Sequence, residues 1–208
     1  MSIQRDPLGS DRTDELLPLG VHVCLLYEDE AERRSFIQRF VQDGLTRGEK
    51  VLYLTDVMTP QEVRDWLGDM GVDQAEDTVA DHLEVAEARS VYYPTGEFVP
   101  ERVFAFWENL DEDVRRTGHP GARATGETSW AVRGIPGAER LLEYEAGLTR
   151  VLQKTSVSAI CQYDVHLFDG RTILDILRVH PVIVSRGQLV QNPFYVGPDD
   201  FMGRQGEA

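Results

Sequence analysis

The sequence has little cysteine, no long hydrophobic run and few basic residues for its length. Cys24 and Cys161 are its only cysteines, too few for a disulfide scaffold, and a reducing compartment would keep them as thiols. The longest apolar runs, such as residues 21–27 and 157–161, fall far short of the ~20 residues that span a bilayer. Residues 1–14 are polar with charges of both signs, so they do not form a secretory signal. A cytoplasmic location is therefore predicted.

The shortage of basic residues sets the charge of the chain. Its formal net charge is −15, from 36 acidic and 21 basic residues, and no stripe of Lys and Arg interrupts the acidic excess. Phosphate backbones and anionic membrane surfaces would be repelled at long range. The sequence therefore predicts no direct contact with nucleic acid or with a membrane.

What the sequence does contain is an alternation of apolar, strand-like runs with amphipathic, helix-like segments. Strands are predicted at 21–27, 50–55, 83–88, 122–126, 157–163, 182–185 and 189–191, and helices at 33–47, 59–71, 100–116, 141–154 and 171–180. This order favours an α/β fold of three layers, with a largely parallel central sheet and helices on both faces. We expect one domain over residues 15–196, with flexible tails at 1–14 and 197–208.

A phosphate-binding loop is missing after the first strand. Such a loop reads Gly-x-x-x-x-Gly-Lys-Ser/Thr, because backbone N–H groups and the Lys must neutralise phosphates. Residues 27–34 read Tyr-Glu-Asp-Glu-Ala-Glu-Arg-Arg, with no glycine and four acidic groups. Only Arg33 and Arg34, both turned back toward the loop, could compensate for that repulsion. No catalytic residue and no cofactor are therefore expected.

The first strand carries candidate ligand-binding residues. His22 lies on a strand expected to be central, where it is interpreted either as a hydrogen-bonded core histidine or as a ligand contact. Alternation places Cys24 on the same face. Tyr27 and Glu28 reach the carboxyl end of the strand, where open α/β sheets bind their ligands.

Further candidates follow the later strands. Cys161, Tyr163 and Asp164 end the second strong strand and could converge on the same crevice, although Cys161 also fits a small buried hydrophobe and Asp164 a turn cap. Glu127 and Trp130 follow another strand in a Gly-rich stretch that suits a mobile loop. Trp130 is interpreted as a lid over an apolar ligand or as a core residue.

The sequence gives only weak indications of a metal site or of a nucleophilic catalytic residue. His22, Cys24, Cys161 and Asp164 could in principle converge, but there is no C-x-x-C motif, no His pair at helical spacing and no dense ligand cluster in the sequence. No metal is therefore expected. No Gly-x-Ser-x-Gly elbow is present either. A redox role for the two thiols would require Cα atoms within about 7 Å of each other.

Several stretches, in order and spacing, resemble the MEDS family of sensory domains, named for methanogen and methylotroph sensing proteins and a dichloromethane-responsive regulator. They are residues 22–27, 44–53, 126–130 (Gly-Glu-Thr-Ser-Trp), 142–146 (Leu-Glu-Tyr-Glu-Ala), 161–164 (Cys-Gln-Tyr-Asp) and the pair His180-Pro181. The resemblance implies a fold related to the RecA and KaiC ATPases, used to sense small molecules such as hydrocarbon derivatives. Since Glu143 and Glu145 lie about 200° apart on a helix, they cannot share a face. The resemblance makes Glu145 the inward candidate.

The resemblance also implies partners, since such domains are attached to or encoded with histidine kinases, anti-sigma-factor kinases and transcription regulators. The chain has no room for an output domain, so we expect a non-enzymatic small-molecule sensor in bacterial or archaeal signal transduction that acts on a separate partner. Two alternatives stay open: a divergent ATPase-like nucleotide switch with Glu127 as the base, and a ligand-free protein-interaction domain. Because RecA-like proteins often assemble, a homodimer is a further expectation.

Overall fold

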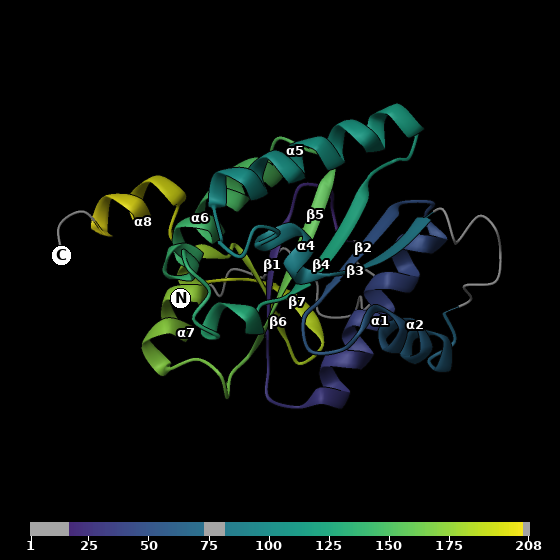
Figure 1. Ribbon diagram of the computed structural model, residues 1–208, viewed down its shortest axis with the longest axis horizontal. Coiled ribbons are helices and arrows are strands. Elements are labelled where there is room, and N and C mark those ends of the chain that lie inside the picture. The colour runs from purple at the N-terminus through teal and green to yellow at the C-terminus, as the bar shows by residue number, and fades with distance from the viewer. Residues whose placement is uncertain (1–16, 73–81, 206–208) are drawn as a thin grey trace, which may run out of the picture.

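A computed structural model describes residues 17–72 and 82–205, so the tail expected at 1–14 lies outside the described residues. Its centre is a seven-stranded sheet in the order β3-β2-β4-β5-β1-β6-β7 (Figure 1). The strands are β1 (His22–Tyr27), β2 (Lys50–Thr55), β3 (Leu83–Glu87), β4 (Ala122–Glu127), β5 (Val157–Asp164), β6 (Val182–Ser185) and β7 (Gln188–Gln191). All neighbouring strands are parallel except β6 and β7, which are antiparallel. The predicted α/β fold with a largely parallel sheet is confirmed.

Helices cover both faces of the sheet (Figure 1). On one face lie α1 (Glu30–Thr46) and α2 (Pro60–Asp69), and on the other α4 (Ala88–Tyr92), α5 (Pro100–Thr117), α6 (Leu141–Leu152) and α7 (Gly170–Val179). Two short 3₁₀ turns, η1 (Ser129–Val132) and η2 (Ala138–Arg140), precede α6. Strand β1 shows how alternation builds the two cores, since Val23 and Leu25 pack toward α1 while Cys24 packs toward α6.

Strand β1 lies between β5 and β6, which confirms its predicted interior position. It pairs residue for residue with β5, and Cys24 lies directly opposite Cys161. Both cysteines are buried and free. Because neighbouring strands lie ~4.8 Å apart, the two Cα atoms meet the distance condition for a redox pair.

The structure differs from the sequence prediction at two helices. Helix α4 begins directly after β3, in a stretch where no helix was predicted, and Tyr92 is buried with its ring 5.0 Å from that of Trp130. Helix α8 (Pro198–Gln205) occupies the region assigned to a flexible tail. Its Phe201 is 5% exposed and packs with Ala146 and Val179. One apolar anchor in a short polar helix gives no periodic pattern, so the sequence could not reveal it.

A capping box begins helix α2. The Thr59 side chain accepts from the Glu62 backbone N–H at 3.3 Å, and Glu62 Oε2 accepts from the Thr59 backbone N–H at 2.7 Å. Replacing Thr59 by alanine is expected to lower the free energy of unfolding by ~1 kcal/mol, because one N–H of the first turn loses its acceptor. Urea denaturation measures this change. The exposed neighbour Gln61→Ala is the control, and an equal loss there would contradict the capping role.

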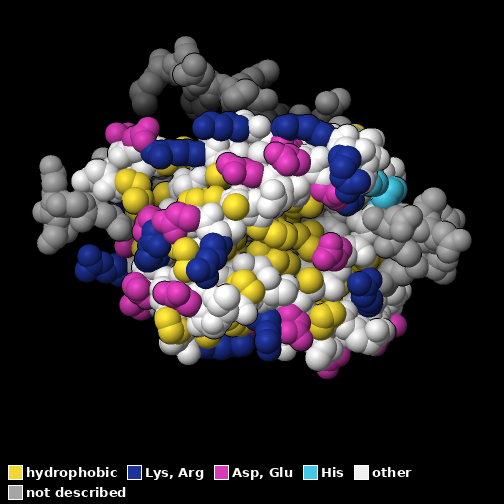
Figure 2. Space-filling view, turned by 45° about the horizontal axis from the view of Figure 1, so that its top comes forward, with side chains coloured by type: hydrophobic (Ala, Val, Ile, Leu, Met, Phe, Trp, Pro, Cys, Tyr) yellow, Lys and Arg dark blue, Asp and Glu magenta, His cyan; other side chains and the backbone are white. Residues whose placement is uncertain are grey.

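The surface mixes charges of both signs. Figure 2, in which the side carrying α5 comes forward, shows Lys and Arg interspersed with Asp and Glu around a central group of hydrophobic side chains. This face therefore carries no basic stripe of the kind that tracks a phosphate backbone. Among the described residues, no helix combines the length and the apolar character that crossing a bilayer requires.

Candidate functional site

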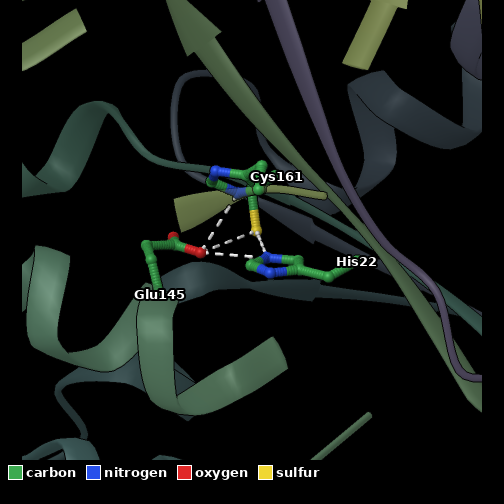
Figure 3. A group of neighbouring side chains, drawn as sticks. His22, Glu145 and Cys161 are labelled. Atoms are coloured by element: carbon green, nitrogen blue, oxygen red, sulfur yellow. Dashed lines mark hydrogen bonds and ion pairs between the residues drawn. The ribbon is translucent and has the colours of Figure 1, made fainter. Parts of the chain in front are cut away.

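A buried polar cluster lies where β1 and β5 meet α6 and the end of α7. Its members, which we call the His–Glu–Cys cluster, are His22, Glu145, Cys161 and His180. None is more than 3% exposed. Figure 3 shows the side chains of His22, Glu145 and Cys161 pointing toward one another from two strands and a helix. Two imidazoles, a carboxylate and a thiol therefore face each other inside the core.

The Glu145 carboxylate is at the centre of this cluster. Its Oε2 lies 3.0 Å from His22 Nε2, 3.3 Å from His180 Nε2 and 3.4 Å from Cys161 Sγ. Cys161 Sγ lies 3.3 Å from His22 Nε2. The other carboxylate oxygen, Oε1, accepts a hydrogen bond of 2.6 Å from the Tyr163 hydroxyl. One ligating atom from each of the four cluster residues fits within 4.8 Å of the others, so the cluster could hold a metal ion.

Burial and mutual charge set the protonation states. Burial, reinforced by His180, lowers the pKa of His22 to about 4, although Glu145 acts in the opposite direction. Burial alone would raise the pKa of Glu145, but the neighbouring His180 and His22 outweigh it and hold this pKa well below its ordinary value. Burial and the Glu145 charge raise the pKa of the Cys161 thiol. At neutral pH, His22 is neutral, Glu145 is charged and Cys161 is protonated.

Local structure explains why the chain brings these residues together. Alternation turns His22 and Cys161 to the α6 side of the sheet, and Glu145 lies on the buried face of that helix. Pro181 ends α7, because it cannot continue the helical hydrogen bonds. His180 before it takes an extended backbone (φ −111°, ψ 118°). The ring of His180 then lies 4.1 Å from that of His22.

A second buried polar group surrounds Glu127 on the opposite side of the sheet. Glu127 Oε1 accepts from the Tyr53 hydroxyl at 2.8 Å and from Arg33 Nη1 at 3.4 Å. Its Oε2 accepts from the backbone N–H groups of Asp56 and Val57, both at 2.8 Å. These donors occupy both carboxylate oxygens, so Glu127 is held as a structural acceptor.

The segment after β1 shows where the two arginines go. Strand β1 ends at Tyr27 and α1 begins at Glu30, and the Asp29 side chain caps the helix by accepting from the Glu32 N–H at 2.8 Å. Arg33 turns inward to Glu127, while Arg34 stays at the surface and donates to Glu30 at 3.0 Å. The short connection is capped by the Asp29 carboxylate, and both arginines donate to the Glu30 carboxylate at the start of α1. This matches the missing phosphate-binding loop.

Comparison with known proteins identifies the family. The family model described as "MEDS: MEthanogen/methylotroph, DcmR Sensory domain" matches residues 21–181. The chain belongs to the MEDS family. No curated protein matches its sequence. Among solved structures, this MEDS domain is similar to a KaiC-like protein from the hyperthermophilic archaeon Pyrococcus horikoshii OT3, with a TM-score of 0.55, 14% identity, and coverage of 80% of this chain and 70% of that one. The predicted RecA/KaiC-like fold is confirmed.

The MEDS domain brings some of the predicted ligand residues together and separates others. His22, Glu145, Cys161 and Tyr163 meet in or beside the His–Glu–Cys cluster, with Cys24 buried nearby on the same face. The sequence contains no dense ligand cluster, but the fold brings His22, Glu145, Cys161 and His180 together. Asp164 is not part of it, because its Oδ1 accepts from the His166 N–H at 2.9 Å and caps the turn.

Three other candidates lie away from the cluster. Tyr27 is half-buried under the Arg33 guanidinium, 5.3 Å from its ring centre, and Glu28 is exposed. Trp130 is fully buried in η1 and stacks on Tyr92, so of its two interpretations, a lid or a core residue, the structure supports the core residue. Its large apolar surface explains this position, since burying an aromatic ring outweighs the local turn signal.

Sequence reasoning missed His180 as a site residue of the MEDS domain. It was noted only with Pro181, as part of the family resemblance. The sequence did contain one signal. His180 directly precedes a proline that must end an amphipathic helix, and this position fixes the direction of the histidine relative to the helix. Arg33, Tyr53 and Gln162 were also missed as a group, since they come from separate elements.

Proposed function

We propose that this MEDS domain is a non-enzymatic sensor of a small molecule in bacterial or archaeal signal transduction, located in the cytoplasm. The observation that carries the proposal is the family match across residues 21–181. The proposed ligand is a hydrocarbon-type compound. The proposed output partner is a separate histidine kinase, anti-sigma-factor kinase or transcription regulator.

The described residues support a role without nucleotide chemistry. A general base must offer a free lone pair to the attacking water. In Glu127, both oxygens already accept hydrogen bonds from Tyr53, Arg33 and two backbone N–H groups. The capped connection between β1 and α1 offers no cradle for a phosphate. These contacts favour the sensor over a divergent ATPase-like switch.

In this proposal, the His–Glu–Cys cluster transmits the effect of ligand binding to helices at the surface. Glu145 connects β1 and β5 to α6, and His180 connects the same group to the end of α7. Helix α8 packs on both helices through Ala146 and Val179. A ligand that displaces one cluster side chain would leave buried polar groups without partners, which favours a second arrangement of these helices. A partner that contacts α7 or α8 would detect that change.

Thermal denaturation with and without compounds tests the proposal. A panel of small apolar and halogenated compounds is compared with magnesium-ATP on the same purified protein. A compound at a hundredfold its dissociation constant is expected to stabilise the fold by ~2.7 kcal/mol, and ATP is expected to have no effect. Magnesium-dependent ATP turnover that is lost in Glu127→Gln would overturn the proposal and establish the nucleotide switch.

Burial favours a second candidate, the ligand-free protein-interaction domain. His22 is 1% exposed and Tyr163 is fully buried, so no open crevice reaches these two residues in this conformation. The two candidates differ in how compounds act on partner binding. A sensor changes its affinity for the output partner when the compound is added, whereas an interaction domain binds the partner equally with and without it.

A further inference from the structure

One buried atom of the His–Glu–Cys cluster has no hydrogen-bond partner. His180 Nδ1 lies 2.7 Å from the Ile176 carbonyl oxygen, and since a carbonyl only accepts, Nδ1 must carry the proton. The Nε2 atom, on the opposite side of the ring, is then directed away from the backbone and toward the centre of the cluster. It is buried, makes no hydrogen bond to any described residue, and lies 3.3 Å from Glu145 Oε2. Either a proton on Nε2 or a metal ion between the two atoms would join this nitrogen to the carboxylate oxygen.

The other cluster residues have outer partners that direct their inner atoms to the same centre. His22 Nδ1 lies 2.8 Å from Thr149 Oγ1, and that hydroxyl lies 3.2 Å from the Val179 carbonyl. When Thr149 donates to this carbonyl, it accepts from His22 Nδ1–H, and the Nε2 lone pair points inward. The Tyr163 hydroxyl occupies Glu145 Oε1 and leaves Oε2 for the centre. Outer hydrogen bonds of this kind orient the ligands of metal sites.

We propose that His22, Glu145, Cys161 and His180 bind one divalent transition-metal ion, preferentially Zn²⁺, in a closed four-coordinate site. Zn²⁺ bonds of about 2.0–2.3 Å place tetrahedral donor atoms roughly 3.3–3.7 Å apart. Four donor pairs of the cluster lie 3.0, 3.3, 3.3 and 3.4 Å apart. Two imidazoles, a thiolate and a carboxylate suit Zn²⁺, whereas Mg²⁺ and Ca²⁺ prefer all-oxygen sites.

The charges of the ligands support the binding of a divalent ion. Zn²⁺ with the Glu145 carboxylate and a Cys161 thiolate gives a neutral group, which can be buried at lower cost than a lone carboxylate. On binding, the S–H bond of Cys161 breaks, a sulfur–zinc bond forms and the proton leaves to water, while both histidines stay neutral. Because all four residues are buried, the ion must enter during folding or through local opening. The metal proposal stands on this geometry and not on the sensory role.

The test uses the whole chain, produced in zinc-supplemented medium and dialysed against EDTA. Elemental analysis is expected to find about one zinc per chain, as a closed site requires. Protein produced with Co²⁺ instead is expected to show the visible bands of tetrahedral cobalt and a near-ultraviolet thiolate-to-cobalt charge-transfer band. Cys161→Ala should lose that band, and Cys24→Ala should keep it, because Cys24 is equally buried on the adjacent strand but is not a ligand.

A milder variant and clear negative results complete the test. Thr149→Val keeps the side-chain shape but removes the outer partner of His22, so it should weaken metal affinity by roughly 10–100-fold in a chelator competition. The unsubstituted protein decides the question even where a variant fails to fold. Zinc below about a tenth of an equivalent, or a full equivalent whose cobalt form lacks the thiolate band, overturns the proposal. So does a thiolate band that persists in Cys161→Ala.

Discussion

Replacing Glu145 by alanine is expected to lower the free energy of unfolding by about 3–5 kcal/mol. The carboxylate accepts from the Tyr163 hydroxyl at 2.6 Å and faces His22, His180 and Cys161, all of them buried. Its removal leaves these polar groups without their central partner and opens a space in the core, and both effects destabilise the folded chain. The midpoint of urea denaturation at neutral pH measures the loss.

Glu143 provides the matched control for this experiment. It lies two residues away on the same helix, but its side chain is 36% exposed and pairs with Arg140 at 2.6 Å. Since surface ion pairs contribute ~0–1 kcal/mol, Glu143→Ala should change the free energy of unfolding by no more than about 1 kcal/mol. Equal, small effects of both substitutions would show that the His–Glu–Cys cluster does not stabilise the fold.

The sequence could predict the strands of this sheet because burial leaves a local signal. Residues 22–25 and 157–163 are buried on both faces and read as apolar runs, and the helices between them show helical spacing. Alternation correctly places His22 and Cys24 on one face. Helical geometry correctly separates Glu143 from Glu145 and leaves one buried and the other at the surface.

The sites themselves left little local signal, because their members come from distant parts of the chain. His22 and Cys161 are 139 residues apart in sequence, and Arg33 and Gln162 are 129 apart. No fixed spacing of the kind found in zinc fingers links such residues, so a search for motifs finds no metal site. The strand order, which places β1 beside β5, brings His22 and Cys161 into contact.

Strand β5 links the two buried polar groups. Its successive residues point to opposite faces, so Cys161 and Tyr163 join the His–Glu–Cys cluster while Gln162 joins the group around Glu127. A shift of this strand by one residue would exchange the two faces and leave both groups unsatisfied. The polar residues of β5 therefore fix its register, which the apolar residues alone would specify less strongly.

The Arg33 side chain should make the second large contribution to stability. It is 3% exposed, and its Nη1 donates to the Tyr53 hydroxyl at 2.9 Å and to Gln162 Oε1 at 2.7 Å, beside the Glu127 carboxylate. Arg33→Met keeps the aliphatic volume but leaves a buried carboxylate without its cation, so we expect a loss of about 3–5 kcal/mol in the free energy of unfolding.

The adjacent Arg34 is the control for that substitution, because it also pairs with Glu30 but is 36% exposed. Arg34→Met should cost less than about 1 kcal/mol in the same urea titration. The contrast separates burial from charge, since both variants lose one positive charge from the same turn of α1. If the two arginines contributed equally, the buried contacts of Arg33 would add nothing beyond a surface ion pair, and Glu127 would depend only on Tyr53 and the two backbone N–H groups.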